Sequence, residues 1–166
     1  MFLHERGIIH QDVKPSNIFI DGLLFKLGDF GVAKTRENPK PMERAGSPFY
    51  MAPELFTGNE SSPSSDAYSF GVMAYELLVG KRPFIGENLE ELTYAHIHKL
   101  PPPTNLPPNL DRIVRNLLTK EPAIRATPQA FLKAIRNPEP QTTEAAAEGK
   151  DKNKSKGLFG GLFRKR

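Results

Sequence analysis

The sequence has no cysteine among its 166 residues. Disulfides and thiolate metal sites are therefore excluded, which agrees with a reducing compartment. Long apolar runs are also missing, since the most apolar stretch, residues 70–79, is far shorter than a bilayer requires and contains Glu76. The opening residues carry charge at once and do not resemble a signal peptide. We expect a cytoplasmic chain.

Excess positive charge is absent from most of the chain. The whole sequence has 23 basic and 19 acidic residues, but residues 150–166 hold seven of the basic residues and one acidic residue. This leaves 16 basic and 18 acidic residues, a net charge of −2, for residues 1–149. Because nucleic-acid-binding domains usually carry their basic residues on the fold itself, we expect no nucleic-acid partner.

The spacing of apolar residues predicts a small β-hairpin followed by helices. Residues 1–7 resemble a helix end stopped by glycine, residues 8–9 a short β-like pair, and residues 18–20 and 24–27 a hairpin around an Asp-Gly turn. Residues 35–44 are expected to form a loop. Helices are predicted from a cap at Ser64 or Ser65 through Val79, around residues 89–97, over residues 110–118, and from a cap at Thr127 to a stop before Pro138.

Composition changes near residue 137, where periodicity is lost. We therefore place one domain at residues 1–137 and a disordered basic tail at residues 138–166. If helical, the tail carries Leu158, Phe159, Leu162 and Phe163 on one face between basic clusters, which predicts weak contact with an anionic membrane surface and a peripheral location. Its paired glycines weaken any helix, which favours the alternative of a solvated tail or docking peptide.

Three motifs follow one another in order. They are His10-Gln11-Asp12-Val13-Lys14-Pro15-Ser16-Asn17, then Asp29-Phe30-Gly31, and then Ala52-Pro53-Glu54. In this order and spacing, they resemble the C-terminal lobe of a protein kinase. Lys14 and residues 46–54 are similar to the serine/threonine branch. The resemblance implies an α+β, protein-kinase-like fold, with a mainly helical C-lobe and a small β-hairpin region at the catalytic loop.

The resemblance also implies roles for the motif residues. Asp12 would act as the base that orients the substrate hydroxyl, and Lys14 would neutralise charge on the γ-phosphate of ATP. Asn17 and Asp29 would hold Mg²⁺ through oxygen ligands. Phe19 occupies the place of the residue beneath the adenine. Ser47 would contact both Asp12 and Lys14 and bind a protein substrate, although a purely structural loop serine remains the alternative.

Further matches concern architecture. Asp66 resembles the aspartate that accepts backbone N–H groups from the catalytic loop, and an acidic residue near a helix start is also favourable in itself. Glu54 and Arg125 resemble an ion pair that ties the activation segment to the last helices, although Arg125 can equally be a solvated charge. His10 and Phe30 resemble packed residues between the two lobes, so we expect a structural His10 rather than a catalytic one.

Two departures from the family pattern qualify these expectations. Gln11 replaces the arginine that pairs with a phosphorylated activation loop, which predicts activity independent of that phosphorylation. The Gly-rich loop and phosphate-binding lysine of an N-terminal lobe are not found in this sequence. We therefore expect the isolated chain to be inactive. The functional alternatives are a partial serine/threonine kinase, a non-catalytic binding or scaffold module, and assembly with a separately encoded N-lobe.

Overall fold

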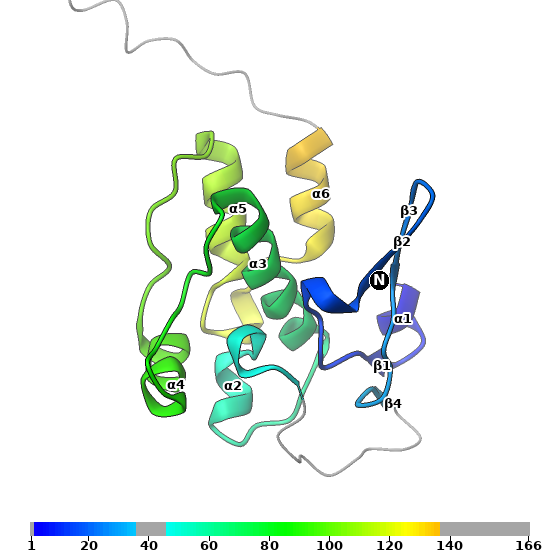
Figure 1. Ribbon diagram of the computed structural model, residues 1–166, viewed down its shortest axis with the longest axis horizontal. Helices are drawn as coiled ribbons and strands as arrows, with labels where there is room; N and C mark the ends of the chain where they lie inside the picture. The colour runs from blue at the N-terminus through cyan, green and yellow to red at the C-terminus, as the bar shows by residue number, and fades with distance from the viewer. Residues whose placement is uncertain (1, 36–45, 137–166) are drawn as a thin grey trace, which may run out of the picture.

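The computed structural model describes residues 2–35 and 46–136. These residues form a mainly helical body with two small antiparallel sheets along one side (Figure 1). The elements, in chain order, are α1 (Phe2–Glu5), β1 (Ile8–Ile9), η1 (Pro15–Asn17), β2 (Ile18–Asp21), β3 (Leu24–Leu27), β4 (Lys34–Thr35), η2 (Pro48–Tyr50), α2 (Pro53–Phe56), α3 (Pro63–Val79), α4 (Leu89–His98), α5 (Pro108–Leu117), η3 (Pro122–Ile124) and α6 (Pro128–Arg136), where η denotes a 3₁₀ turn. The α+β architecture predicted from the sequence is confirmed.

The predicted hairpin is present as strands β2 and β3. Ile18 pairs with Leu27 and Asp21 with Leu24, so the Asp-Gly turn closes the hairpin where the sequence places it. A second pairing joins β1 to β4, with Ile8 opposite Thr35. The expectation of a loop from residue 35 was wrong at Thr35, because the free edge of β1 takes residues 34–35 as a strand partner. The rest of that predicted loop lies outside the described residues.

Helix α3 forms the centre of the helical body. Tyr68, Val72 and Tyr75 are fully buried, and helices α5 and α6 pack along it (Figure 1). The approach of α5 depends on Gly71, since a Cβ there would lie 2.7 Å from the Cβ of Leu117. Side-chain burial around α3, rather than helix propensity, therefore accounts for most of the stability of this helix.

The N-terminus of α3 differs from the expected cap at Ser64 or Ser65. Ser62 is the N-cap: its hydroxyl accepts from the Ser64 backbone N–H, and the Ser65 hydroxyl accepts from the backbone N–H of Ser62. The helix starts earlier because Pro63 fits the first helical position, where its missing N–H has no cost. Ser65 therefore completes a capping box instead of forming the cap.

The remaining helix predictions are confirmed. Helix α4 begins at Leu89 and α5 covers the apolar spacing of residues 110–117, while the hydroxyl of Thr127 accepts from the Ala130 backbone N–H at the start of α6. The protein's described part, residues 2–35 and 46–136, has no helix that is long and apolar enough to cross a membrane. The predicted disordered basic tail lies outside the described residues.

A buried polar cluster lies between α3, α4 and the end of α5. The ring of His96 is fully buried, and its Nδ1 lies 3.0 Å from the hydroxyl of Tyr68. The ammonium of Lys120 donates to the backbone carbonyl of His96 and lies 3.9 Å from the ring centroid of Phe84. Burial, reinforced by the nearby Lys120 charge, lowers the pKa of His96 to about 3. His96 is therefore neutral in the folded protein at neutral pH.

This cluster predicts that mild acid destabilises the fold. The folded-state pKa of His96 lies below the unfolded value of about 6.5, so the unfolded chain binds the extra proton and stability falls as pH drops below about 6.5. Between pH 7 and pH 5, above the range of the carboxylates, we expect a loss of about 2 kcal/mol from His96. Urea unfolding at both pH values measures this loss. If the free energy of unfolding of His96→Gln falls as much between pH 7 and pH 5 as that of the parent chain, His96 is not the cause of the pH dependence.

Candidate active site

Asp12 lies in the turn after β1, and three groups contact its carboxylate. Its Oδ1 accepts from the Ser47 backbone N–H at 2.9 Å, and its Oδ2 lies 2.7 Å from Lys14 Nζ and 3.0 Å from Asn17 Nδ2. Burial opposes ionisation, but the hydrogen bond from Lys14 and those from Ser47 and Asn17 outweigh it, and the pKa of Asp12 lies below its usual value. The carboxylate is therefore ionised at neutral pH and held in one orientation.

The backbone of this turn is held by Asp66 at the start of α3. Gln11 has a φ of 68°, a left-handed conformation that costs a non-glycine residue about 1–3 kcal/mol. The two carboxylate oxygens of Asp66 accept from the backbone N–H groups of His10 and Gln11, each at 2.9 Å. His4 Nε2 adds a third contact to Asp66 at 2.8 Å. The strained turn is thus anchored to the central helix, as the sequence predicts for Asp66.

Asn17 is buried beside Asp12, with its amide in a defined orientation. Its Nδ2 lies 2.8 Å from the backbone carbonyl of Asp12 and 3.0 Å from the Asp12 carboxylate. Both amide protons are therefore used on Asp12, which leaves the side-chain oxygen to act as an acceptor or ligand. An amide oxygen is a suitable ligand for a hard cation such as Mg²⁺.

Asp29 is brought to Asn17 by the backbone. The N–H of Gly28 donates to the carbonyl of Asn17 at 2.9 Å, so the residue that follows Gly28 lies alongside the turn of residues 10–17, hereafter the catalytic turn because of the resemblance of its sequence. Asp29 has a φ of 60° and is exposed, with one carboxylate oxygen 3.3 Å from the backbone nitrogen of Gly31. Asn17 and Asp29 together offer two oxygen ligands, which fits Mg²⁺ because this ion keeps several waters and takes further ligands from substrate phosphates.

His10 is fully buried and supports the site without facing it. Its Nε2 lies 2.9 Å from the carbonyl of Gly28, and its Nδ1 lies 3.3 Å from the backbone nitrogen of Asp12. The ring of Phe30 packs edge-on against it, with 4.9 Å between ring centroids. The imidazole thus joins the Asp12 turn to the Asp29 turn, which is a positioning role.

Ser47 contacts Asp12 through its backbone N–H. This contact depends on Gly46, which has a φ of 100° and approaches the catalytic turn so closely that a Cβ would lie 2.6 Å from the Gln11 carbonyl oxygen. A side chain at residue 46 would therefore push this part of the chain away from Gln11, and the Ser47 N–H would lose its hydrogen bond to Asp12. The predicted contact of Ser47 with Lys14 remains a prediction.

Glu54 and Arg125 form a buried, two-pronged ion pair. Both distances between guanidinium nitrogens and carboxylate oxygens are 2.8 Å, and the Arg125 side chain is 0% exposed. Arg125 also donates to the backbone carbonyls of Thr119, Lys120 and Ser64, while Ser65 donates to Glu54. Burial acts to raise the pKa of Glu54, but Arg125 more than offsets it and the pKa lies below its usual value. The structure thus joins the segment after Ser47 to the last helices.

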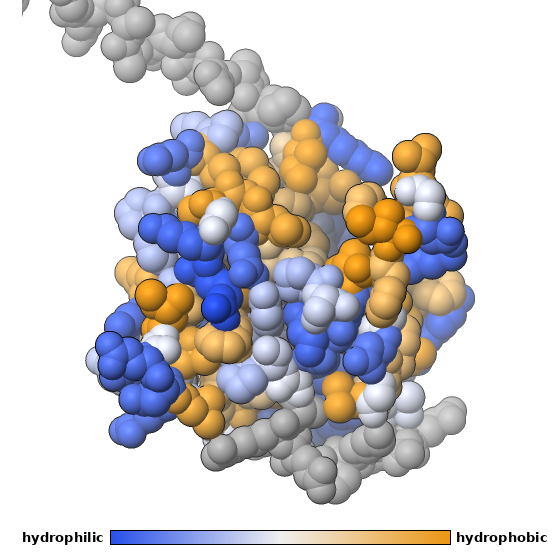
Figure 2. Space-filling model, viewed as in Figure 1, coloured by the Kyte–Doolittle hydropathy of each residue, from blue (hydrophilic) through white to orange (hydrophobic). Residues whose placement is uncertain are grey.

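Phe19 and Phe30 belong to an exposed apolar surface on the side of the two sheets. The ring of Phe19 lies directly over Gly28, where a Cβ would meet it at 2.6 Å. Phe19 is 55% exposed and Phe30 45%. Apolar side chains also gather around the hairpin in Figure 2, and the exposed members there are Phe2, Ile20, Leu23, Leu24 and Phe25. A surface of this kind indicates contact with another folded unit or a ligand.

Two further contacts near the site were not expected from the sequence. The amide of Gln11 donates to the hydroxyl of Ser61 at 2.6 Å, and Lys34 Nζ lies 3.2 Å from a carboxylate oxygen of Glu60. These partners are 50 and 26 residues away in the chain, and neither residue type marks such a pair in a single sequence. Gln11 and Lys34 therefore have neutral and acidic partners within the fold.

Comparison with known proteins identifies the family of the chain. The protein kinase domain family matches residues 1–135, and the chain belongs to this family. It is 41% identical over 128 residues to the serine/threonine-protein kinase PknA of Mycobacterium tuberculosis, an alignment that covers 74% of this chain and 30% of the relative.

Other relatives show the same likeness. The serine/threonine-protein kinase PknB of Mycobacterium leprae is 35% identical over 143 residues, covering 80% of this chain and 23% of the relative. PknA of Corynebacterium glutamicum is 32% identical over 181 residues, covering 98% of this chain and 38% of the relative. The chain thus spans less than half the length of these curated relatives.

Proposed function

We propose that this chain supplies the catalytic lobe of a serine/threonine protein kinase, which transfers the γ-phosphoryl group of ATP to hydroxyl groups of a protein substrate. The observation that carries this proposal is the ionised Asp12 carboxylate, held between Lys14, Asn17 and the backbone of Ser47. An anion fixed beside a cation and an oriented amide is suited to receive a hydroxyl proton close to a phosphate.

Each residue has a distinct part in this proposal. Asp12 orients the attacking hydroxyl and takes up its proton, while the ammonium of Lys14 lies where it can offset charge on the phosphoryl oxygens. Asn17 and Asp29 hold Mg²⁺ through their side-chain oxygens. When bound, Mg²⁺ neutralises phosphate charge and fixes the orientation of the triphosphate. Phe19 packs beneath the nucleotide base, and Ser47 lies beside the incoming substrate segment.

The alternative is a non-catalytic kinase-like binding or scaffold module. The exposed apolar surface around Phe19 and Phe30 favours a binding role, because such a surface needs a partner. One such partner is an N-lobe supplied by another chain. When an N-lobe covers that surface, a catalytic lobe should transfer phosphate, whereas a binding module should not.

Phosphate transfer tests the proposal in two arms. The chain is assayed alone and joined to the portion of Mycobacterium tuberculosis PknA that precedes the matched region, with radiolabelled ATP, Mg²⁺ and a generic basic protein. We expect label on serine and threonine, and none on tyrosine, from the joined protein. A joined protein that is folded and binds ATP but transfers no phosphate would favour the binding module. Transfer by the chain alone would contradict its expected inactivity.

We also predict that activity does not require phosphorylation of the segment that follows Asp29. Gln11 stands in the place of the family's arginine and is a neutral amide that bonds to Ser61, so it cannot make a charge-assisted pair with a phosphate. Thr35 is the only hydroxyl residue between Asp29 and Ser47. Thr35→Ala in the joined protein is expected to keep activity within about twofold, as measured by initial rates. Near-complete loss, restored by Thr35→Glu, would show that a phosphate is needed.

A further inference from the structure

An apolar groove lies next to the catalytic turn, between η2, α2 and α4. It has a volume of about 400 Å³ and is lined by Pro48, Met51, Leu55, Phe56, Leu89 and Glu90. Gly46 also lines it, and a Cβ at Gly46 would lie 3.5 Å from the Asp12 carboxylate. The groove therefore opens beside Asp12, and its size suits a few apolar side chains.

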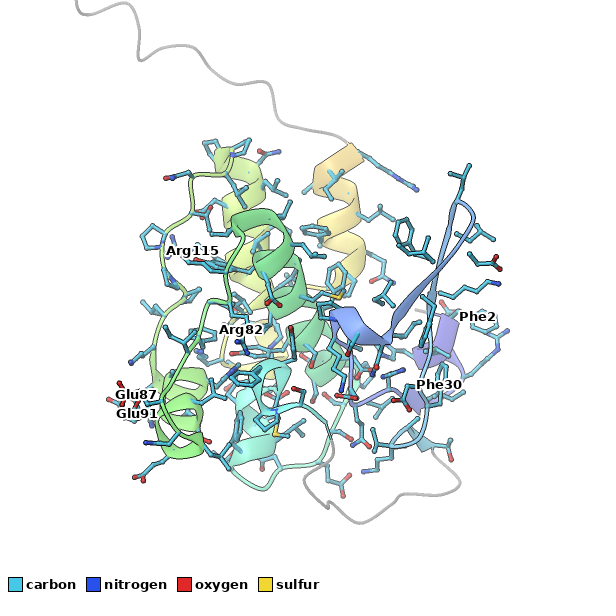
Figure 3. All side chains as sticks on the ribbon, in the orientation of Figure 1. Phe2, Phe30, Arg82, Glu87, Glu91 and Arg115 are labelled. Carbon is cyan, nitrogen blue, oxygen red and sulfur yellow. The ribbon has the colours of Figure 1, made fainter. Side chains whose placement is uncertain are left out.

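The edge of the groove along α4 is acidic. Glu90 is exposed on the groove, whereas Glu87 and Glu91, at the start of α4, lie on the side of this helix that faces away from α2 (Figure 3). Between residues 83 and 98, the sequence has these three glutamates and no lysine or arginine. An occupant that combines apolar side chains with flanking positive charge is therefore complementary to both the floor and the edge of this groove.

One segment of the same chain has this composition. Residues 150–166 carry a net charge of +6 and contain the apolar pairs Leu158-Phe159 and Leu162-Phe163 between basic clusters. Residues 1–136 contain 16 basic and 15 acidic residues, so the charge complementarity with this segment is local to the glutamate on the groove. We propose that residues 150–166 dock in this groove within their own molecule, with Leu158 and Phe159 against its apolar floor and the lysines toward Glu90.

The connection is long enough for this docking. Helix α6 ends at Arg136, and residues 137–157 lie between it and Leu158. Fully extended, this stretch reaches about 70 Å, whereas a domain of this size is only about 40 Å across. A connection that spans its sites gives an effective concentration on the order of 1 mM, so a weak site is enough for occupancy.

Docking also brings a hydroxyl residue toward Asp12. Ser155 precedes Leu158 by three residues, or about 10 Å of extended chain. The docked segment then occupies the place of a protein substrate, a consequence that rests on the proposed function, whereas docking itself does not.

Disulfide trapping in the full chain tests the docking without any need for activity. The sequence has no cysteine, so Thr93→Cys, which lies on the groove, can be paired with Phe159→Cys alone. In dilute, oxidising, low-salt buffer we expect an intramolecular disulfide to form at least about tenfold faster than in a control with the same cysteine pair, and thus the same connection, in which Leu158, Leu162 and Phe163 are replaced by serine. Adding Glu90→Lys, or raising the salt concentration, should remove most of this advantage.

Three results would overturn the proposal. These are equal trapping rates with and without the three serine replacements, a rate that neither salt nor Glu90→Lys affects, and disulfide that joins two molecules and increases with protein concentration. Far-ultraviolet circular dichroism of each variant checks that its helices are retained. A failure of trapping together with intact phosphate transfer in the joined protein would remove the docking proposal and leave the proposed function standing.

Discussion

Replacing Asp12 by asparagine is expected to lower phosphate transfer by the joined protein about 1,000-fold or more. An amide cannot take up the hydroxyl proton, and this type of catalysis contributes about 10²–10⁴-fold. The substitution Asp12→Asn also removes the negative charge that draws Lys14 Nζ to 2.7 Å from the carboxylate. The measurement is the initial rate of label transfer from ATP at saturating Mg²⁺.

The matched control for this change is Asp21→Asn, an exposed aspartate on the hairpin that bonds to Lys26. It makes the same chemical change away from the catalytic turn, and activity should stay within about twofold. ATP affinity measured by calorimetry should be nearly equal for the parent and Asp12→Asn. If Asp12→Asn keeps more than about a tenth of the activity, Asp12 is not the base.

Replacing Arg125 by alanine is expected to be the most destabilising single change in the described part of the chain, costing about 3–5 kcal/mol. The guanidinium is fully buried and makes both prongs of the pair with Glu54. Without it, the Glu54 carboxylate is a buried charge with no cation, and three backbone carbonyls lose a donor. Urea or thermal unfolding measures the change in the free energy of unfolding.

An exposed ion pair gives the comparison. Lys26→Ala removes the partner of Asp21 on the hairpin, where both side chains are more than half exposed, and we expect a change of about 0–1 kcal/mol. If Arg125→Ala costs no more than Lys26→Ala, the pair with Glu54 does not hold the fold together. In that case the link between the segment after Ser47 and the last helices must rest on apolar packing alone.

Much of the fold was predictable because its signals are local. The Asp-Gly turn sets the hairpin register, and Thr127 followed by Pro128 marks the start of α6. The order and spacing of the three motifs predict the family, and the structure places Lys14 and Asn17 within hydrogen-bond distance of Asp12. Local spacing is enough for these three residues, because they lie within a single turn of the chain.

The contacts that the sequence did not reveal are between distant segments. Gln11 with Ser61 and His4 with Asp66 depend on how the catalytic turn lies against the start of α3, which no local pattern encodes. The N-cap of α3, Ser62, was missed because four serines around Pro63 are each acceptable caps by residue type. Only the backbone conformation before the proline distinguishes them. Strand β4 was missed because Lys34 lacks the β-branched apolar side chain that marks Ile8 and Ile9, and its pairing with β1 joins segments that are distant in the sequence.

The most direct test of the central claim, that Asp12 and Asp29 serve one phosphoryl-transfer site in different roles, is metal rescue. Asp29→Cys in the joined protein introduces a thiolate, which binds Mg²⁺ poorly but binds the softer Cd²⁺ well. We predict that phosphate transfer is lost in Mg²⁺ and partly restored by Cd²⁺ in Asp29→Cys, while Asp12→Cys is restored by neither ion. Rescue of both variants, or of neither, would contradict the assignment of Asp29 to the metal and Asp12 to the hydroxyl.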